Sequence, residues 1–288
     1  MACSLTGMTF TRSQTAALLT EHGLRPSRAR GQNFVADPNT VRRIARLAEV
    51  GPGDQVVEIG AGLGSLTLAL AETGARVTAV EVDRHLVAIL RQTVEPTGVA
   101  LVEGDAMTLD WAALLGSQPG GWVLVANLPY NIATPLVADL LDQVPAIGRM
   151  LVMVQREVGE RLAAPASSDA YGAVSVKVAY WATAKVVGRV PASVFIPRPA
   201  VESVLVDIRR LGQPAVDPTV VAAPELFELV RAGFGQWRKM LRKSLEAMVG
   251  PDDFECAHVE PTARAEELDV LAWGRLAACR RHRSQSDG

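Results

Sequence analysis

Strand-like and helix-like hydrophobic patterns alternate along the first half of the chain. An apolar run at residues 56–59 leads into a glycine-rich turn, and residues 65–72 follow with a helical pattern. The turn has glycine at every second position, at Gly60, Gly62 and Gly64. A second apolar run at residues 76–80 ends in Glu81, about twenty residues after the turn. This order predicts a buried strand, a tight turn, a helix and a second strand, because glycine lets the backbone turn sharply.

The same alternation continues to residue 155 and predicts a parallel sheet with helices on both faces. Further strands are expected at residues 99–102, 122–126 and 149–155, and helices at residues 38–47 (capped by Asp37), from Asp83 onward, and at 134–141. Ligands bind beyond the carboxyl ends of the strands in such sheets. The glycine turn, Glu81, Asp105 and Asn127 all follow strands at those ends. We therefore expect a single site at this edge of the sheet.

The second half of the chain changes from sheet to helix. Strands are expected at residues 184–189 and 201–209, helices at 158–164, 174–181, 226–234, 238–248, 264–268 and 270–279, and disorder at 282–288. The predicted organisation has three parts. Residues 1–30 are an N-terminal extension with a short helix at 12–22, residues 31–212 form a Rossmann-like α/β domain, and residues 213–288 form a smaller all-helical domain.

Composition limits the class of protein. The chain has 288 residues, 49% of them hydrophobic and 21% charged, which is enough to bury a sizeable core. No apolar run is long enough to span a membrane, and the N-terminus does not resemble a signal peptide, so we expect a cytoplasmic protein. The three cysteines, Cys3, Cys256 and Cys279, are too scattered to predict a disulfide framework or a zinc site. The four histidines, His22, His85, His258 and His282, are isolated, and no metal is expected.

Charge alone argues mildly against nucleic-acid binding, because the net charge is −2 and the sequence pI is about 6.1. The basic residues nevertheless cluster near the N-terminus and in the C-terminal helices. The candidates for RNA contact are Arg28, Arg30, Arg238, Lys239, Arg242 and Lys243. Clustered bases on an acidic chain can form a face that binds phosphates. Solvated helix faces are the alternative interpretation.

The spacing of the glycines indicates the kind of ligand. It is G-x-G-x-G and not the G-x-G-x-x-G of dinucleotide-binding folds. A nucleoside ligand without a pyrophosphate is therefore favoured, with S-adenosylmethionine as the leading candidate and NAD as the alternative. Glu81, at the tip of the second strand, is where the two hydroxyls of a ribose are expected.

The tetrapeptide Asn127-Leu128-Pro129-Tyr130 is the strongest indication of the chemistry. An asparagine oxygen and a backbone carbonyl can accept the two N–H bonds of an exocyclic amine and hold it for attack on a methyl group. Pro129 stiffens the turn, and Tyr130 offers a flat face for stacking a base. No strong general base is required, because the sulfonium of S-adenosylmethionine is a good leaving group. An ordinary loop with a buried tyrosine is the structural alternative.

Taken together, these motifs resemble the KsgA-type (also called RsmA-type) ribosomal RNA adenine dimethyltransferases over residues 28–275. The resemblance rests on Gly31-Gln-Asn-Phe34, Glu58-Ile-Gly60-Ala-Gly62-Leu-Gly64, Val80-Glu81-Val-Asp83, Gly104-Asp105-Ala106-Met107, Asn127-Leu-Pro-Tyr130, Tyr171-Gly172-Ala-Val-Ser175-Val176, Phe195-x-Pro197-x-Pro199-x-Val201-x-Ser203 and Phe234-x-Gln236-x-Arg238-Lys239-x-Leu241. The sequence departs from the family at Trp237, where a basic residue is usual. The segment before Arg28 is long compared with the family, and Met8 is a candidate alternative start. We expect neither this segment nor Trp237 to affect the chemistry.

The resemblance implies a monomeric enzyme with a class I S-adenosylmethionine-dependent methyltransferase sheet. Its expected substrate is the small-subunit precursor, in which it dimethylates N6 of two adjacent adenosines in the 3′-terminal hairpin of 16S rRNA. The implied cofactor residues are Asn33, Val35, Gly60, Glu81, Asp105 and Asn127, with Gly62 and Gly64 of the turn. Asn127, the Leu128 carbonyl and Tyr130 would hold the unstacked base. Phe195 would close its other face or else be a packing residue.

Two alternatives to this function stay open at the level of sequence. An Erm-type enzyme, which methylates one adenosine of large-subunit 23S rRNA, shares the cofactor and catalytic loops. A non-catalytic assembly placeholder would use the fold only for binding. The long C-terminal part with Arg238-Lys239 favours the small-subunit enzyme, and the intact Glu81, Asp105, Asn127 and Tyr130 favour activity.

Overall fold

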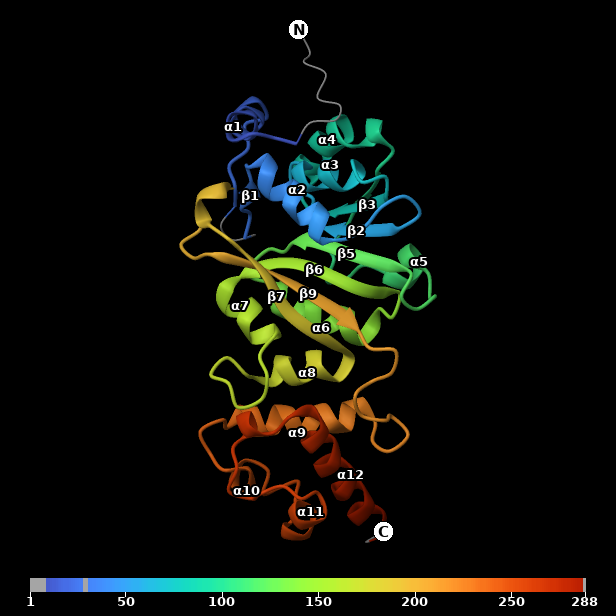
Figure 1. Ribbon diagram of the computed structural model, residues 1–288, viewed down its shortest axis with the longest axis vertical. Coiled ribbons are helices and arrows are strands. Elements are labelled where there is room, and N and C mark those ends of the chain that lie inside the picture. The colour runs from blue at the N-terminus through green and yellow to red at the C-terminus, as the bar shows by residue number, and fades with distance from the viewer. Residues whose placement is uncertain (1–8, 28–30, 287–288) are drawn as a thin grey trace. The chain divides into compact units, whose positions relative to one another are not determined.

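A computed structural model describes residues 9–27 and 31–286 (Figure 1). The predicted alternative start at Met8 and the predicted RNA contacts Arg28 and Arg30 lie outside the described residues. The chain forms two compact units. The first comprises the described residues of Met1–Gly159 together with Lys185–Arg209, and the second comprises those of Glu160–Ala184 and Arg210–Gly288. The segment 160–184 thus groups with the C-terminal residues.

Seven strands form one sheet in the order β4-β3-β2-β5-β6-β9-β7 (Figure 1). Their bounds are β2 (Gln55–Ile59), β3 (Arg76–Glu81), β4 (Ala100–Glu103), β5 (Trp122–Asn127), β6 (Ile147–Gln155), β7 (Ala182–Val190) and β9 (Ser203–Arg210). The strands from β4 to β6 are parallel, whereas β9 runs antiparallel to β6. The predicted α/β class is confirmed, with one reversed strand near the edge of the sheet.

The helices that accompany this sheet are α1 (Arg12–Glu21), α2 (Pro38–Leu47), α3 (Ser65–Ala71), α4 (Arg84–Thr93), α5 (Trp111–Leu115), α6 (Ala133–Gln143) and α7 (Arg156–Leu162), with 3₁₀ turns at Glu95–Thr97 and Ala192–Val194. Two of them, α2 and α4, begin at the capping residues that the sequence predicts. The Asp37 carboxylate accepts the Thr40 N–H at 2.9 Å, and Asp83 accepts the His85 N–H at 3.1 Å. Each side chain satisfies a backbone donor that has no partner within the helix, which fixes the start of α2 and α4.

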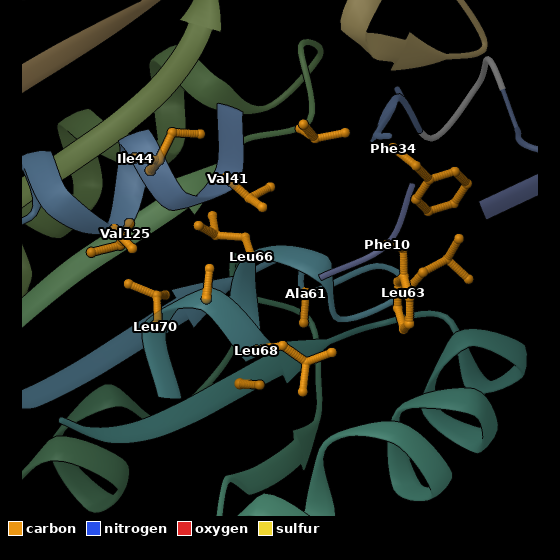
Figure 2. Packing of buried hydrophobic residues seen from close by; sticks show 14 of the residues in the cluster. Phe10, Phe34, Val41, Ile44, Ala61, Leu63, Leu66, Leu68, Leu70 and Val125 are labelled. Carbon is orange, nitrogen blue, oxygen red and sulfur yellow. The ribbon is translucent and has the colours of Figure 1, made fainter. Parts of the chain in front are cut away.

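The core of the first unit lies between the helices and the sheet. Figure 2 shows Val41 and Ile44 of α2 opposite Leu66 and Leu70 of α3, with Val125 of β5 beside them. All five side chains are buried. This packing holds the first turn of α3 against the sheet, directly after the glycine turn.

A second, two-stranded sheet joins segments far apart in the sequence. Strand β1 (Phe34–Val35) pairs antiparallel with β8 (Phe195–Ile196), so that Val35 lies opposite Phe195. The hydrophobic pattern predicted a loop at the first segment and an extended stretch at the second, but not their pairing. Two-residue strands carry no periodic signal, so only the tertiary structure reveals them.

The second unit is mainly helical and packs around Trp273, which is fully buried. Its helices are α8 (Ala173–Trp181), α9 (Ala223–Gly235), α10 (Leu241–Ser244), α11 (Pro251–Cys256) and α12 (Val270–Ser286), with a 3₁₀ turn at Ala265–Glu267. The long helix predicted at 238–248 is wrong, because only α10 is helical there. Disorder from residue 282 is also wrong as far as Ser286, where α12 ends.

The two C-terminal cysteines form a disulfide, Cys256–Cys279, which joins α11 to α12. The prediction that the cysteines form no disulfide is therefore wrong for this pair. The two residues are separated by 23 positions, and only the packing of the two helices brings their Cα atoms to 6.0 Å. The use of cysteine consequently gives no argument about the cellular compartment.

Candidate active site

A cavity lies at the carboxyl ends of β2, β3 and β5, within the first unit. Most of the predicted cofactor residues line it. These are Asn33, Val35, Gly60, Gly62, Glu81, Asp105 and Asn127, and Pro129 joins them. The structure thus brings together residues from five separate stretches of the chain at the edge where parallel sheets bind their ligands.

The glycine turn has the backbone conformation that its sequence predicts. Gly60 and Gly62 have φ of 74° and 63°, which residues with a side chain rarely adopt. A Cβ on Gly62 would lie only 3.1 Å from the Phe34 ring. Gly64 also has a positive φ, of 92°, and its surroundings leave no room for a side chain. It precedes α3 outside the cavity lining, and a Cβ there would lie 2.7 Å from the Val94 side chain.

The Glu81 carboxylate is held by three backbone N–H groups. One oxygen accepts from Gly62 at 2.8 Å, and the other accepts from Val82 and Asp83 at 3.0 Å each. Burial raises the pKa of Glu81, and these N–H donors oppose the rise. The carboxylate is therefore fixed in place, with remaining acceptor capacity on both oxygens.

A second buried carboxyl, Glu58, lines the same cavity and is 1% exposed. Its Oε2 has no hydrogen-bond partner among the described residues. Burial raises the pKa of Glu58 to about 8, and the neighbouring Glu81 adds to the rise. The sequence showed Glu58 ahead of the glycine turn, but its position inside an apolar run gave no sign that it faces a cavity.

The raised pKa of Glu58 leads to a prediction about stability. Between pH 4.5 and about 8 the folded protein keeps the Glu58 proton while the unfolded chain loses it, so stability falls as pH rises through this window. The free energy of unfolding should fall by at most about 1.4 kcal/mol per pH unit in the wild type, and we expect Glu58→Gln to remove this fall. Urea unfolding of both proteins at pH 5, 6.5 and 8 measures it. The exposed Glu95→Gln is the control, and equal pH slopes in wild type and Glu58→Gln would contradict the prediction.

Asn127 is the last residue of β5, and its amide is oriented by a fixed contact. Its Nδ2 donates to the Asn33 carbonyl at 2.9 Å, and the Asn33 side chain in turn donates to the Gly31 carbonyl at 3.1 Å. With its nitrogen bound in this way, the Asn127 amide keeps its oxygen as a free acceptor. Asp105 is oriented similarly, because its Oδ1 accepts the Met107 N–H at 2.9 Å.

The rest of the tetrapeptide forms a rigid turn. The Leu128 N–H donates to the Met153 carbonyl at 3.1 Å, and the Pro129 carbonyl accepts from Ile132 and Ala133 at the start of α6, both at 3.1 Å. The Tyr130 hydroxyl hydrogen-bonds the Ser203 hydroxyl at 2.8 Å. Burial raises the pKa of Tyr130, and this hydrogen bond opposes it. Leu128 and Tyr130 are adjacent to the cavity without lining it.

Phe195 lies in β8 and is fully buried in the core of the first unit. Its ring is not exposed in this structure, and its carbonyl accepts two contacts from the Arg12 guanidinium, each at 3.2 Å. The expectation that Phe195 closes over a target base stays a prediction.

The described basic candidates all lie in the second unit. Arg238 and Lys239 belong to the exposed stretch between α9 and α10, and Arg242 and Lys243 lie on α10. Trp237 is 56% exposed, and the Arg238 guanidinium lies 6.0 Å from the centre of its ring. A flat exposed ring beside cations is a surface on which an unpaired base can stack.

The structure adds residues that the sequence did not single out. Phe10, Thr15 and Gln32 line the cavity, and Ser203 supports Tyr130. Gln32 and Ser203 stood inside motifs whose spacing matched, whereas the short segment around Phe10 carried no such signal.

Two absences among the described residues bear on other classes of protein. In residues 9–27 and 31–286, no three His, Cys, Asp or Glu side chains come together as a metal site would require. No described helix has the length and hydrophobicity to cross a bilayer.

The chain is also similar in sequence to known proteins. The family model for ribosomal RNA adenine dimethylase matches residues 25–279. The ribosomal RNA small subunit methyltransferase A of Kineococcus radiotolerans is 46% identical over 267 residues, covering 89% of this chain and 87% of that protein. The protein of the same name from Streptomyces coelicolor is 46% identical over 285 residues, covering 95% and 96%.

Solved structures show the same fold. A dimethyladenosine transferase from Plasmodium falciparum aligns with a TM-score of 0.70 at 23% identity, covering 83% of this chain and 94% of that one. The 23S rRNA methyltransferase ErmE aligns with a TM-score of 0.66 at 23% identity, covering 86% and 99%. The predicted fold, a Rossmann-like class I methyltransferase sheet with a smaller helical part, is confirmed.

Proposed function

Because the chain belongs to the ribosomal RNA adenine dimethylase family, we propose that it dimethylates N6 of two adjacent adenosines in the 3′-terminal hairpin of 16S rRNA. The methyl donor in this proposal is S-adenosylmethionine. Two relatives that are 46% identical are named small subunit methyltransferases, which favours the small-subunit RNA over an Erm-type action on 23S rRNA.

The cavity suits this donor. Two buried carboxyls, Glu58 and Glu81, line it, and no Lys or Arg is among the described residues of the lining. The ribose hydroxyls of a bound ligand would donate hydrogen bonds to the Glu81 carboxylate, and a positive charge on the ligand would stabilise its ionised form. Asn33, Val35, Gly60, Gly62, Glu81 and Asp105 would hold it. When bound, S-adenosylmethionine supplies a methyl group activated on a sulfonium.

Asn127 carries the proposed chemistry. Its nitrogen is bound to the Asn33 carbonyl, so its oxygen is the acceptor available for one N–H of the adenine amine. The Leu128 carbonyl would accept the other, which directs the nitrogen lone pair out of the ring. Tyr130, held by Ser203, would stack on the base after it leaves the RNA stack. The proton is lost from a cationic product to water, without a dedicated base.

We propose that the enzyme acts as a monomer in the cytoplasm on a precursor of the small subunit. The basic residues near α10 and the exposed Trp237 would contact the RNA backbone and an unpaired base. A purely structural assembly factor would have no need for the oriented Asn127 amide. Binding without catalysis is therefore the less favoured function.

The test combines the purified protein and labelled S-adenosylmethionine with small subunits that lack the methyl marks, and with large subunits in parallel. Mass spectrometry of the digested nucleosides is expected to find N6,N6-dimethyladenosine only in small-subunit RNA. Label in large-subunit RNA would indicate an Erm-type enzyme. Tight binding without label would indicate an assembly placeholder.

A further inference from the structure

The segment before residue 28 was expected to lie away from the chemistry, yet two of its residues line the cavity. Phe10 is fully buried, and Thr15 is 1% exposed. Both belong to the lining that also includes the cofactor candidates Glu81 and Asn127. A fully buried aromatic ring in this wall shapes the cavity through its packing, because its own surface is covered by protein.

Phe10 is fixed to the element that follows the glycine turn. Its N–H donates to the Ser65 hydroxyl at 3.3 Å, and Ser65 is the first residue of α3. Figure 2 shows Phe10, Leu63 and Phe34 gathered at one end of the buried cluster. Phe10 is therefore held beside the start of the helix that follows the glycine turn.

Helix α1 holds this segment in position. Thr11 and Gln14 form a capping box at its start, and Leu18 and Leu19 are buried in the core of the first unit. A capping box satisfies two backbone donors reciprocally, so the helix has a defined first turn. The position of Phe10 follows from this start, because it stands one residue ahead of the cap.

Arg12 connects α1 to the two-stranded sheet. Both terminal nitrogens of its guanidinium contact the Phe195 carbonyl at 3.2 Å. Phe195 pairs with Val35, and β1 also carries Phe34, whose ring lies over Gly62. Arg12 thus holds β8, and through it the strand that carries a cofactor candidate.

We propose that residues 9–21 form part of the wall of the methyl-donor pocket, with Phe10 and Arg12 as positioning residues. This inference rests on the proposed use of S-adenosylmethionine. Loss of the fully buried Phe10 ring leaves a void behind the wall of the pocket, and loss of the Arg12 guanidinium frees the β1–β8 pair. Both changes act on binding of the donor, before methyl transfer.

The experiment measures the dissociation constant for S-adenosylmethionine by calorimetry, together with the melting temperature. We expect Phe10→Ala to weaken binding by about tenfold, and Phe10→Leu to weaken it less, because the leucine fills part of the space behind the wall. Arg12→Ala should weaken binding about fivefold, and Arg12→Lys should restore part of it. In turnover with small subunits, Arg12→Ala should raise the KM for S-adenosylmethionine and leave kcat nearly unchanged.

Leu70→Ala and Arg42→Ala are the controls. Leu70 is buried in the same cluster without lining the cavity, and Arg42 forms an exposed ion pair with Glu72 at 3.4 Å. The inference is overturned if Phe10→Ala and Leu70→Ala lower the melting temperature alike while Phe10→Ala binds the donor as wild type does. A wild-type protein that binds no S-adenosylmethionine would overturn the proposed function and this inference together.

Discussion

Replacing Asn127 with alanine is expected to lower kcat by about 10²–10³-fold, the size of effect seen when one preorganised polar group is removed from an active site. The affinity for S-adenosylmethionine should change by less than about tenfold, since the remaining cofactor candidates are untouched. The reason lies in the contact between the Asn127 nitrogen and the Asn33 carbonyl at 2.9 Å. That contact selects the orientation of the amide, so alanine removes an acceptor that is already aimed.

Single-turnover methylation of undermethylated small subunits measures this effect separately from binding. Asn39→Ala is a matched control, because Asn39 is an exposed asparagine on α2 outside the cavity lining. Near-normal turnover of Asn127→Ala would remove Asn127 from the proposed chemistry. An equal loss of cofactor affinity and turnover would instead assign it to binding of the donor.

The double substitution Arg238→Glu with Lys239→Glu should weaken binding to the small-subunit particle, most strongly at low salt. Both residues are exposed, so each can neutralise a phosphate and release its counterions. The ratio of the wild-type to the variant binding constant should therefore fall by about tenfold between 50 and 200 mM salt. This follows from the loss of two phosphate contacts, each with a slope of roughly 0.7–0.9 in log K against log salt.

The control carries the same change in net charge at a different place. Arg84 and Arg91 are exposed on α4, and Arg84→Glu with Arg91→Glu reverses two charges in the first unit. We expect this variant to bind the particle nearly as wild type does. A loss of affinity for the Arg238 and Lys239 variant that does not depend on salt would point to misfolding of the second unit.

Local rules were enough to predict the elements that position the cofactor candidates. Asp37 and Asp83 begin helices because their side chains accept backbone N–H groups a few residues ahead. Gly62 needs a positive φ, and Glu81 follows a strand whose hydrophobic run ends there. In each case, neighbouring residues in the sequence determine the structure.

Features that depend on distant partners were beyond the same rules. The predicted helix at 238–248 shortens to α10, whose first N–H groups, on Leu241 and Arg242, donate to the carbonyls of Ala263 and Pro261. The pairing of Val35 with Phe195 joins residues that are far apart in the sequence, and the sequence did not predict it. The place of Phe10 in the cavity wall depends on its contact with Ser65, 55 residues further along the chain, which no periodicity encodes.

Because β9 runs antiparallel to β6, one short piece of chain supports two parts of the site. Ser203, the first residue of β9, lies opposite Gln155, the last residue of β6. The strand β9 therefore begins at the edge of the sheet where the parallel strands end. One contiguous piece of chain, residues 191–203, therefore contributes both β8 and the hydroxyl that holds Tyr130. A chimaera that exchanges only this piece between relatives keeps the recipient's own glycine turn, Glu81 and Asn127. The graft therefore tests the support that this piece gives to β1 and Tyr130 separately from the cofactor candidates themselves.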